Sequence, residues 1–436
     1  MTTYYIWDRQ LGPERYIAAT IWDPQRVRAA KSPDCPSRNE QHTKKTHSRP
    51  KIPSMFLNRL TQRTLTLMHS QVAQTLLCVF TFTLITPPCS PVRGDDIVID
   101  TSLNIETNRL FGAEHPGIYK HPASITELAD GDLYMAYYGG AGEYSKDTAV
   151  YGSRREGGRT WSPPVVIADT PYEAEGNPVV WQAPDGVVWL FYVNLAGKTW
   201  SDARVKAKIS RDGAVTWSDS FMISDERGSM VRGKPIVLQD GDYLLPMYHE
   251  TGDDREMTAD DTASYFLRYH PATGQWSESS RIRSANGNLQ PQVVQWTDKD
   301  LVCYMRRGGG FGPSTSGYVL RADSHDGGRT WTDAVNTDLK NPNSAIDVER
   351  LANGHLAIVY NDHMYNRTPL TVAISTDRGK TFAFRRDIGG GDNTFAYPYM
   401  IQTRDGKILV LYTTNNRSTI MLAEFVEDAI TKYVHE

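Results

Sequence analysis

The sequence predicts an all-β protein built from six repeated four-stranded units, and two periodic patterns support this prediction. The first is a series of short turns between apolar segments, such as "ADGDLYMAYY" and "RDGKILVLYT". The second is the segment "SHDGGRTW", Ser324 to Trp331, which recurs along the chain with small changes. Because both patterns repeat at a similar spacing, each unit is expected to contain one of each.

Six hairpin turns mark the units. Four contain Asp-Gly and one contains Asn-Gly, which is a strong hairpin signal because a type I′ turn needs residues with positive φ. Consecutive turns lie 52 to 58 residues apart. Their first residues are Asp130, Asp185, Asp240, Asp298, Asn353 and Asp405.

The second pattern is a polar turn, expected between the third and fourth strands of a unit. Its Ser and Asp side chains are suited to bonding backbone amides, its Gly supplies positive φ, and its aromatic residue packs. We therefore expect a structural role and no part in chemistry. Its acidic residues are Glu156, Asp212, Asp326 and Asp377, with one degenerate copy, "YHPATGQW", in the long interval after Asp212.

Each unit thus contains four antiparallel strands, and six such units predict a six-bladed β-propeller. The sixth unit has no fourth strand of its own after "TIMLAEF". The segment "DDIVID", Asp95 to Asp100, is expected to supply that strand from the N-terminal side. Closing the ring in this way would leave no open sheet edge.

Three parts of the chain differ in composition. Residues 1–54 are polar and without period, as expected of a disordered or untranslated extension. Residues 55–94 combine arginines, the apolar run "LLCVFTFTLI" and small residues, which is typical of a signal peptide. That run is too short to span a membrane. Residues 95–430 are expected to form the propeller, in a secreted or periplasmic protein.

Charge and cysteine content exclude several classes of protein. Residues 95–436 carry 34 Lys and Arg against 46 Asp and Glu, and an acidic body of this kind argues against a nucleic-acid partner. Cys303 is the only cysteine there, so no disulfide framework is expected. We find no metal-binding spacing and no phosphate-binding loop, so we predict no metal and no cofactor. Nothing indicates an obligate protein partner.

The repeated turn resembles the Asp-box (BNR repeat) of sialidases and related glycosidases. The resemblance covers about residues 110–430 and includes "EGNPVVW", "GKPIVL" and "TPLTVAISTDRGKTF". It implies a six-bladed propeller that acts on or binds glycans. The group also contains lyases and non-catalytic propellers, so the resemblance is more specific for the fold than for the substrate.

The substrate end of a propeller is expected where the inner strands begin. A proline recurs at that point in five units, and in the sixth Ser344 takes its place. The residues immediately before it are polar in every unit, and they are expected to surround one mouth of the central channel. These residues are His121, Asn177, Lys234, Gln290, Asn343 and Tyr397.

Loops that join second to third strands, and the inner strands themselves, add further polar residues to this mouth. Carboxyl groups there can transfer protons and arginines can bind a sugar carboxylate. The loops contribute Glu143, His249, Glu250, Arg306, Arg307, Asp362, His363 and Arg417, and the strand starts contribute Glu175, Arg232 and Asp347.

The resemblance also implies roles for particular residues. Tyr397 matches the place of a sialidase nucleophile, and Glu143 lies in the loop that would hold the proton donor. Arg306 is expected to bind a carboxylate. His121 stands where sialidases carry an arginine, so ordinary sialosides are expected to be poor substrates. Asp347, His121 and Glu175 are further catalytic candidates. The candidates for substrate binding are Asn177, Arg232, Lys234, His249, Gln290, Arg306, Asn343, Asp362 and Arg417.

The function predicted from these residues is glycoside hydrolysis at a terminal acidic or deoxy sugar. Two alternatives remain open. In a polysaccharide lyase, His121 or Tyr397 would remove the C5 proton of a uronate while Lys234 or an arginine neutralises its carboxylate. A non-catalytic glycan-binding propeller would use the same polar ring without chemistry.

Overall fold

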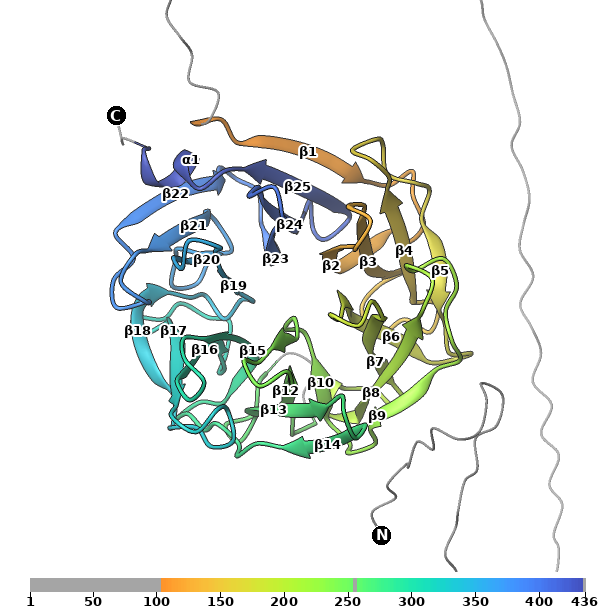
Figure 1. The fold of residues 1–436 in the computed structure, drawn as a ribbon, viewed down its shortest axis with the longest axis horizontal. Helices are drawn as coiled ribbons and strands as arrows, with labels where there is room; N and C mark the ends of the chain where they lie inside the picture. Colours follow the sequence, from red (N-terminus) through yellow and green to blue (C-terminus); the bar gives the residue numbers. More distant parts are fainter. Residues whose placement is uncertain (1–102, 254–256, 434–436) are drawn as a thin grey trace, which may run out of the picture. The chain divides into compact units, whose positions relative to one another are not determined.

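Six antiparallel sheets surround a common axis in the computed structural model, which describes residues 103–253 and 257–433 (Figure 1). The predicted six-bladed β-propeller is therefore confirmed. Helix in the described residues is confined to single short turns such as α1 (Asp428–Thr431) and a 3₁₀ turn, Trp200–Asp202.

The first three blades follow the chain from the axis outward. Blade 1 contains β2 (Tyr119–Glu127), β3 (Leu133–Gly140), β4 (Ala149–Arg155) and β5 (Val165–Ala168). Blade 2 contains β6 (Ala174–Gln182), β7 (Val188–Leu195), β8 (Ala203–Ser210) and β9 (Phe221–Ser224). Blade 3 has a divided inner strand, β10 (Ser229–Val231) and β11 (Ile236–Val237), followed by β12 (Tyr243–His249), β13 (Ala263–His270) and β14 (Gln275–Glu278).

The remaining blades complete the ring. Blade 4 contains β15 (Asn288–Gln295), β16 (Leu301–Arg307), β17 (Tyr318–Ser324) and β18 (Val335–Lys340). Blade 5 contains β19 (Asp347–Arg350), β20 (Leu356–Asn361), β21 (Leu370–Ser375) and β22 (Phe384–Gly389). Blade 6 contains β23 (Ala396–Gln402), β24 (Ile408–Thr414), β25 (Thr419–Phe425) and, outermost, β1 (Glu106–Phe111).

The hydrophobic core lies between blades. The described residues form six apolar clusters, one at each boundary between neighbouring blades. Second strands contribute to the clusters on both of their faces, and every residue of β24, "ILVLYTT", is buried. A strand covered on both faces has a continuous apolar sequence, which explains why these strands appear as uninterrupted hydrophobic runs.

An N-terminal strand closes the ring, but not the strand expected from the sequence. β1 pairs antiparallel with β25, from Glu106 opposite Glu424 to Phe111 opposite Ile420. The prediction that Asp95 to Asp100 would fill this position is therefore wrong, and that segment lies outside the described residues. β1, "ETNRLF", is exposed along most of its length, so it lacks the apolar pattern by which we searched for the strand.

The predicted hairpin turns are present, but their geometry is not type I′. In the hairpin turn of blade 1, Gly131 has positive φ, at 92°, and Asp130 does not. Gly131 N–H donates to Leu128 O and Leu128 N–H to Asp132 O, at 2.9 and 2.8 Å. This pattern is a type I turn followed by a left-handed glycine, the three-residue hairpin. One glycine is sufficient because only the bulge position requires positive φ.

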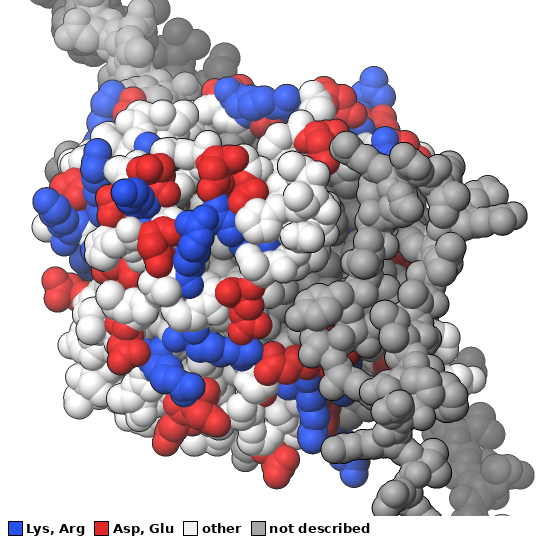
Figure 2. Space-filling view, turned by 60° about the horizontal axis from the view of Figure 1, so that its bottom comes forward, with Lys and Arg blue, Asp and Glu red and all other residues white. Residues whose placement is uncertain are grey.

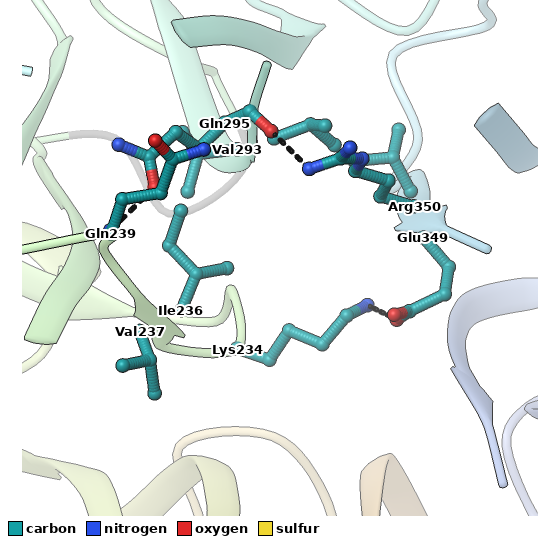
Figure 3. A pocket seen from close by; sticks show the side chains of 10 residues that line it. Lys234, Ile236, Val237, Gln239, Val293, Gln295, Glu349 and Arg350 are labelled. Atoms are coloured by element: carbon teal, nitrogen blue, oxygen red, sulfur yellow. Dashed lines mark hydrogen bonds and ion pairs between the residues drawn. The ribbon is translucent and has the colours of Figure 1, made fainter. Parts of the chain in front are cut away.

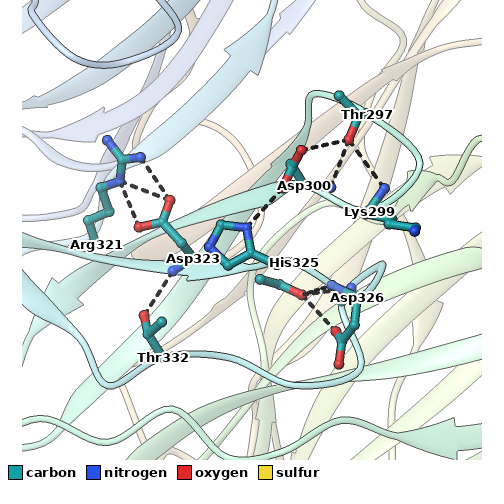
Figure 4. Close-up of polar contacts among 10 residues, drawn as sticks. Thr297, Lys299, Asp300, Arg321, Asp323, His325, Asp326 and Thr332 are labelled. Carbon is teal, nitrogen blue, oxygen red and sulfur yellow. Dashed lines mark hydrogen bonds and ion pairs between the residues drawn. The ribbon is translucent and has the colours of Figure 1, made fainter.

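The repeated turn has the structural role predicted for it. Asp326, which is labelled in Figure 4, accepts hydrogen bonds from the backbone amides of Arg329 and Thr330 and from the hydroxyls of Ser324 and Thr330, at 2.6 to 3.0 Å. Trp331 stacks on Phe266 of blade 3, with 4.6 Å between ring centroids. The turn therefore joins neighbouring blades through its aromatic residue.

Arginines in the third strands make a second connection between blades. Arg154 in blade 1 pairs with Asp130 and Asp132 of its own hairpin turn and donates to Gly213 O in the repeated turn of blade 2. Arg268 in blade 3 connects its hairpin turn to Gly327 O of blade 4 in the same way. Hairpin turns and repeated turns therefore lie at the same end of the propeller.

Acidic and basic side chains are interspersed on the face seen in Figure 2. This mixture provides no extended basic surface on that face. Within the described ranges, the structure contains no helix with the length and apolar content of a membrane span. The regions expected to be an extension (1–54) and a signal peptide (55–94) lie outside the described residues.

We predict that Asp326→Ala destabilises the fold by roughly 1–3 kcal/mol, because several backbone and hydroxyl donors lose their acceptor. Burial raises the pKa of Asp326. Hydrogen bonds from Thr330, Ser324 and Arg329 lower this pKa by more, so it is below its usual value. A depressed carboxyl pKa contributes stability above the unfolded value of about 3.9 and loses it at lower pH. The difference in unfolding free energy should therefore be largest near neutral pH and shrink in acid.

Denaturant unfolding of both proteins at several pH values measures this difference. Asp333→Ala is the matched control, because Asp333 is exposed and its side chain makes no hydrogen bond or ion pair with the described residues. Equal losses in the two variants would contradict the prediction.

We also predict that β1 is required for a closed ring. A chain that starts at residue 103 keeps β1, whereas one that starts at Gly112 leaves the edge of β25 unpaired. An open strand edge promotes association. The shorter chain should form aggregates in light scattering while the longer one remains monodisperse, and identical behaviour would show that closure by β1 is dispensable.

Candidate functional site

The inner strands carry bulges where they begin. Pairing registers shift between Gly176 and Val179, between Leu289 and Gln292, and between Ala396 and Tyr399. A bulge changes the direction of a side chain and is common beside active sites. The residue before the Pro, or before Ser344, has positive φ in four blades: Asn177 (43°), Gln290 (56°), Asn343 (58°) and Tyr397 (52°).

Three of these residues, Asn177, Gln290 and Tyr397, line a pocket at the end of the propeller where the inner strands begin. It encloses about 530 Å³, part of it open to solvent. Its lining is mostly polar, with arginines and carboxyl groups on several blades and aromatic residues at the rim. The lining residues are Glu143, Asn177, Trp200, Met230, Tyr248, Glu250, Met257, Thr258, Leu289, Gln290, Arg306, Phe311, Arg367, Tyr397 and Arg417.

Tyr397 has a phenolic oxygen held by two donors. Gln290 Nε2 lies 3.2 Å from it and Arg306 Nη1 lies 3.0 Å from it. Burial raises the pKa of Tyr397, but Arg306, Arg367 and Arg417 lower it and outweigh the burial, so the pKa is below the usual value. The two hydrogen bonds donated to the phenolic oxygen also stabilise the phenolate, which lowers the pKa of Tyr397 as well.

Arg306 and Arg367 form a pair of adjacent cations. Each guanidinium carbon lies 5.9 Å from the Tyr397 ring centroid, and both also approach Phe311. Arg306 Nε donates to Asn343 Oδ1 at 2.7 Å, and Arg367 Nη2 donates to Asn343 O at 3.3 Å. Among the described residues, no carboxylate forms an ion pair with either arginine. Burial and the neighbouring Arg306 lower the pKa of Arg367 to about 10.

Arg417 is paired, unlike the other two arginines. Its Nη1 lies 2.8 Å from Glu143 Oε2 and 2.7 Å from the Tyr119 hydroxyl. Tyr119 also donates to Glu143 Oε2 at 2.9 Å. Burial raises the pKa of Tyr119, so this hydroxyl keeps its proton and acts as a donor to the carboxylate. Glu143 is therefore held as the counter-ion of Arg417.

Glu250 is the second carboxyl group of the pocket. It is half-buried at the end of β12, and among the described residues no donor bonds its side chain. Burial raises the pKa of Glu250 to about 7, with Glu143 adding to the effect and Arg306 opposing it. A carboxyl group with a pKa near neutrality is suited to general acid catalysis.

His121 lies beneath Tyr397, with 4.1 Å between ring centroids, and is buried. Its Nδ1 is 2.9 Å from Thr413 Oγ1, and that hydroxyl donates its own proton to Ala396 O. Nδ1 must therefore carry the imidazole proton. Burial and the nearby arginines keep the pKa of His121 well below its usual value. His121 is thus a neutral packing partner of Tyr397 and supplies no cation.

Some predicted site residues lie outside the pocket. Glu175 is buried on the regularly paired part of β6, where Asn194 Nδ2 lies 3.4 Å from its carboxylate. His249 bonds Arg227 O at 2.9 Å, away from its neighbour Glu250. Asp362 pairs weakly with Lys340 and Arg385. None of these three side chains is among the residues that line the pocket.

Lys234 and Asp347 belong to the opposite part of the axis. Lys234 Nζ lies 2.8 Å from Asp347 Oδ1, and Asp347 also accepts Met400 N–H at 2.6 Å. Lys234 Nζ also lies 3.3 Å from Glu349 Oε2, and both residues line a second pocket of about 610 Å³, part of it open to solvent, near Gln239 and Gln295 at the far ends of the inner strands (Figure 3). This pair therefore connects blades 3 and 5 below the polar pocket.

The sequence reasoning missed Arg367 and gave Glu250 no role. Arg367 lies three residues before β21 and Arg417 lies two residues before β25. Comparing the ends of these loops would have found Arg367, whereas we looked at their beginnings. Within the described ranges no cluster of three His, Cys, Asp or Glu side chains could hold a metal ion.

The fold and this pocket define a sialidase-like propeller with a polar site at one end of its axis. Residues 131–410 match the family model of the BNR repeat-like domain, so the chain belongs to the BNR repeat-like family. A search of curated proteins finds no match to the sequence.

Solved structures share the fold at low sequence identity. The Hadza microbial sialidase Hz136 is 18% identical with a TM-score of 0.61, covering 74% of this chain and 68% of that one. The NanB sialidase from Streptococcus pneumoniae is 10% identical with a TM-score of 0.62, covering 74% and 71%. The α-L-arabinofuranosidase Arb93A from Fusarium graminearum is 13% identical with a TM-score of 0.56, covering 75% and 99%. At these identities the comparisons show the fold alone.

We predict that Glu250→Gln stabilises the protein above pH 7 and not at pH 5. The folded pKa of about 7 exceeds the unfolded value of about 4.3, so the folded state binds more protons between these values. Wild-type stability therefore falls as the pH rises towards 7, whereas glutamine does not titrate. Thermal melts across this range measure the effect.

Glu143→Gln is the matched control, because Glu143 forms an ion pair with Arg417. It should destabilise the protein at pH 8. Equal shifts in the two variants would show that the environments of the two carboxyl groups do not differ as described.

Proposed function

We propose that the chain is an exo-acting glycoside hydrolase whose substrate is a terminal sugar carrying a carboxylate. The observation that supports this proposal best is the adjacent pair Arg306 and Arg367, with no carboxylate partner among the described residues. Unpaired cations in a partly buried site are costly unless an anion binds there. Guanidinium groups bind carboxylates with good geometry, so a sugar acid suits this pair.

In the proposed reaction Tyr397 is the nucleophile. Its oxygen attacks the anomeric carbon, and the bond to the leaving oxygen breaks. Arg306 and Gln290 support this step because both donate to the phenolic oxygen and stabilise its anionic form. A water molecule then displaces Tyr397 and completes hydrolysis. Tyrosine nucleophiles are an established exception to the use of paired carboxylates in glycosidases.

Glu250 is the proposed proton donor to the leaving oxygen. The sequence favoured Glu143 for this role, but Glu143 accepts hydrogen bonds from both Tyr119 and Arg417. The pKa of about 7 supports Glu250, because a carboxyl group with this pKa keeps its proton in about half of the molecules at pH 7. Glu143 then orients Arg417 at the edge of the pocket.

Sialosides were expected to be poor substrates because His121 stands where sialidases carry an arginine. Arg367 supplies a third guanidinium at the pocket, so sialosides are again candidates among the acidic sugars. The signal-like composition of residues 55–94 supports an exported enzyme.

The test is an assay of aryl glycosides with the full chain. The protein should cleave at least one of two acidic substrates, an aryl sialoside and an aryl uronide. It should not cleave neutral aryl glycosides. Arg306→Met and Arg367→Met should each raise KM, while Arg211→Met, an exposed arginine on blade 2, serves as the control. Tyr397→Phe should lower kcat at least about a hundredfold through loss of the nucleophile. Cleavage of neutral sugars that the arginine variants leave unchanged would refute the proposal.

We predict that kcat falls as the pH rises above about 7, because Glu250 loses its proton there. In Glu250→Gln this fall of kcat above pH 7 should disappear. The loss of rate relative to wild type should be smaller for aryl leaving groups that need no protonation. Rates of two substrates with different leaving groups across pH 5 to 9 measure this dependence. An unchanged fall of kcat in Glu250→Gln would assign the proton donor to another residue.

A lyase remains the second candidate, because a tyrosine of lowered pKa beside two arginines also suits proton removal next to a carboxylate. Uronate-containing polysaccharides discriminate the two reactions. A lyase forms an unsaturated product with new ultraviolet absorbance, whereas a hydrolase forms reducing ends without it.

A further inference from the structure

Arg232 crosses the axis of the propeller from blade 3 to blade 6, which lie on opposite sides of the ring (Figure 1). Its Nη2 donates to two carbonyl oxygens of blade 6, Tyr397 O at 3.1 Å and Pro398 O at 3.0 Å. The side chain is fully buried, and its guanidinium lies 5.0 Å from the Tyr399 ring centroid. Arg232 does not line the pocket, but it contacts the backbone of a residue that does.

The divided inner strand of blade 3 makes this crossing possible. β10 ends at Val231 and β11 begins at Ile236, so residues 232–235 do not pair as a strand. Gly233 brings this segment against blade 4, since a Cβ there would lie 2.3 Å from Pro291 O. Arg232, freed from the sheet ladder, extends towards the opposite blade.

Stability alone does not account for this arginine. Its Nε and Nη1 atoms are buried and have no hydrogen-bond partner among the described residues. A buried cation without a full set of partners costs free energy, and an apolar side chain of similar length would avoid that cost. What the arginine adds is a pair of hydrogen bonds to the carbonyls on either side of Pro398.

Those two carbonyls belong to the strained part of blade 6. Tyr397 has φ of 52°, which a large aromatic residue rarely adopts and which costs about 1–3 kcal/mol. One planar guanidinium that binds successive carbonyls fixes the orientation of both peptide planes. That orientation determines where the phenolic oxygen meets Gln290 and Arg306.

We propose that Arg232 is a positioning residue that holds Tyr397 in its left-handed conformation and thereby places the hydroxyl between Gln290 and Arg306. The role of Arg232 in catalysis rests on the proposed function, in which Tyr397 attacks the sugar. Its role in placing the hydroxyl does not, and it can be measured without any substrate.

The test is a spectrophotometric titration of tyrosines in the full-length protein. Wild type should show one tyrosine that ionises before the others, and Tyr397→Phe should remove that step. In Arg232→Met the step should move to higher pH, because the hydroxyl loses its alignment with the two donors along with a nearby positive charge. A folded Arg232→Met protein with an unchanged first step would overturn the proposal.

Arg268→Met is the matched control. Arg268 is a buried arginine of the same blade, but it bonds the hairpin turn and Gly327 at the opposite end. Its loss should lower the melting temperature and leave the first tyrosine step in place. If it moved the step as far as Arg232→Met, the effect would reflect general loosening and the proposal would fail.

Arg232→Lys supports the same test if Arg232→Met does not fold. Lysine keeps the charge, but its shorter side chain does not extend as far as Arg232 Nη2, the atom that donates to both carbonyls. The step should again move to higher pH, and an unchanged position would count against the proposal.

Kinetics separate the two proposals. With an active substrate, Arg232→Met should lower kcat roughly a hundredfold while KM stays close to wild type, as expected for a misplaced reacting group. If the titration results hold but no glycoside is cleaved, the proposed function fails and the positioning role stands. If cleavage occurs and Arg232→Met leaves kcat unchanged, the positioning role in catalysis fails and the proposed function stands.

Discussion

The left-handed residue at the start of the inner strands is the constraint on which the pocket depends. Regular strands would alternate their side chains between the two faces of each blade, and the mouth would receive no coherent set of groups. The bulge breaks this alternation, and the strained residue turns its side chain towards the axis. Side-chain partners stabilise the strain: Asn177 donates to Tyr248, Gln290 to Tyr397, and Asn343 accepts from Arg306. The ring of the mouth is therefore self-supporting, with each strained residue bonded to another site residue.

The same geometry explains which parts of the site could be predicted from the sequence. Spacing of the Pro positions found Gln290 and Tyr397, because the bulge has one place in every blade. The sequence does not show where regular strand pairing ends. Glu175 was therefore expected at the mouth beside Asn177, but it lies before the bulge and pairs with Asn194 of the neighbouring strand. Arg367 was missed for a different reason. The loops before the third strands vary in length and have no internal period, so counting from the start of a loop does not show which residue near its end reaches the mouth.

Fold prediction succeeded where a turn chemistry repeats and failed where one strand stands alone. Six hairpin turns and the Ser-Asp-Gly turns impose a period that no other architecture shares, and both kinds of turn join blades at the same end. β1 has no such neighbour in sequence. Its partner β25 is more than 300 residues away along the chain, and the exposed pattern of β1 reflects its place at the outer edge of the ring. A strand of that kind is specified by its partner and by closure of the ring more than by its own composition.

Charge in the pocket is set by competition between burial and the arginines. The arginines lower the pKa of Tyr397, suppress protonation of His121, and only partly oppose the burial that raises the pKa of Glu250. Burial and one set of cations together therefore give a phenol of lowered pKa, a neutral imidazole and a carboxyl group of raised pKa within a single site. Leaving Arg306 and Arg367 without a carboxylate partner costs stability. The arginine contacts between blades are separate from that cost, because they lie at the opposite end of the propeller from the mouth. This division lets one end of the propeller hold the ring together while the other keeps the unpaired charges that an anionic substrate requires.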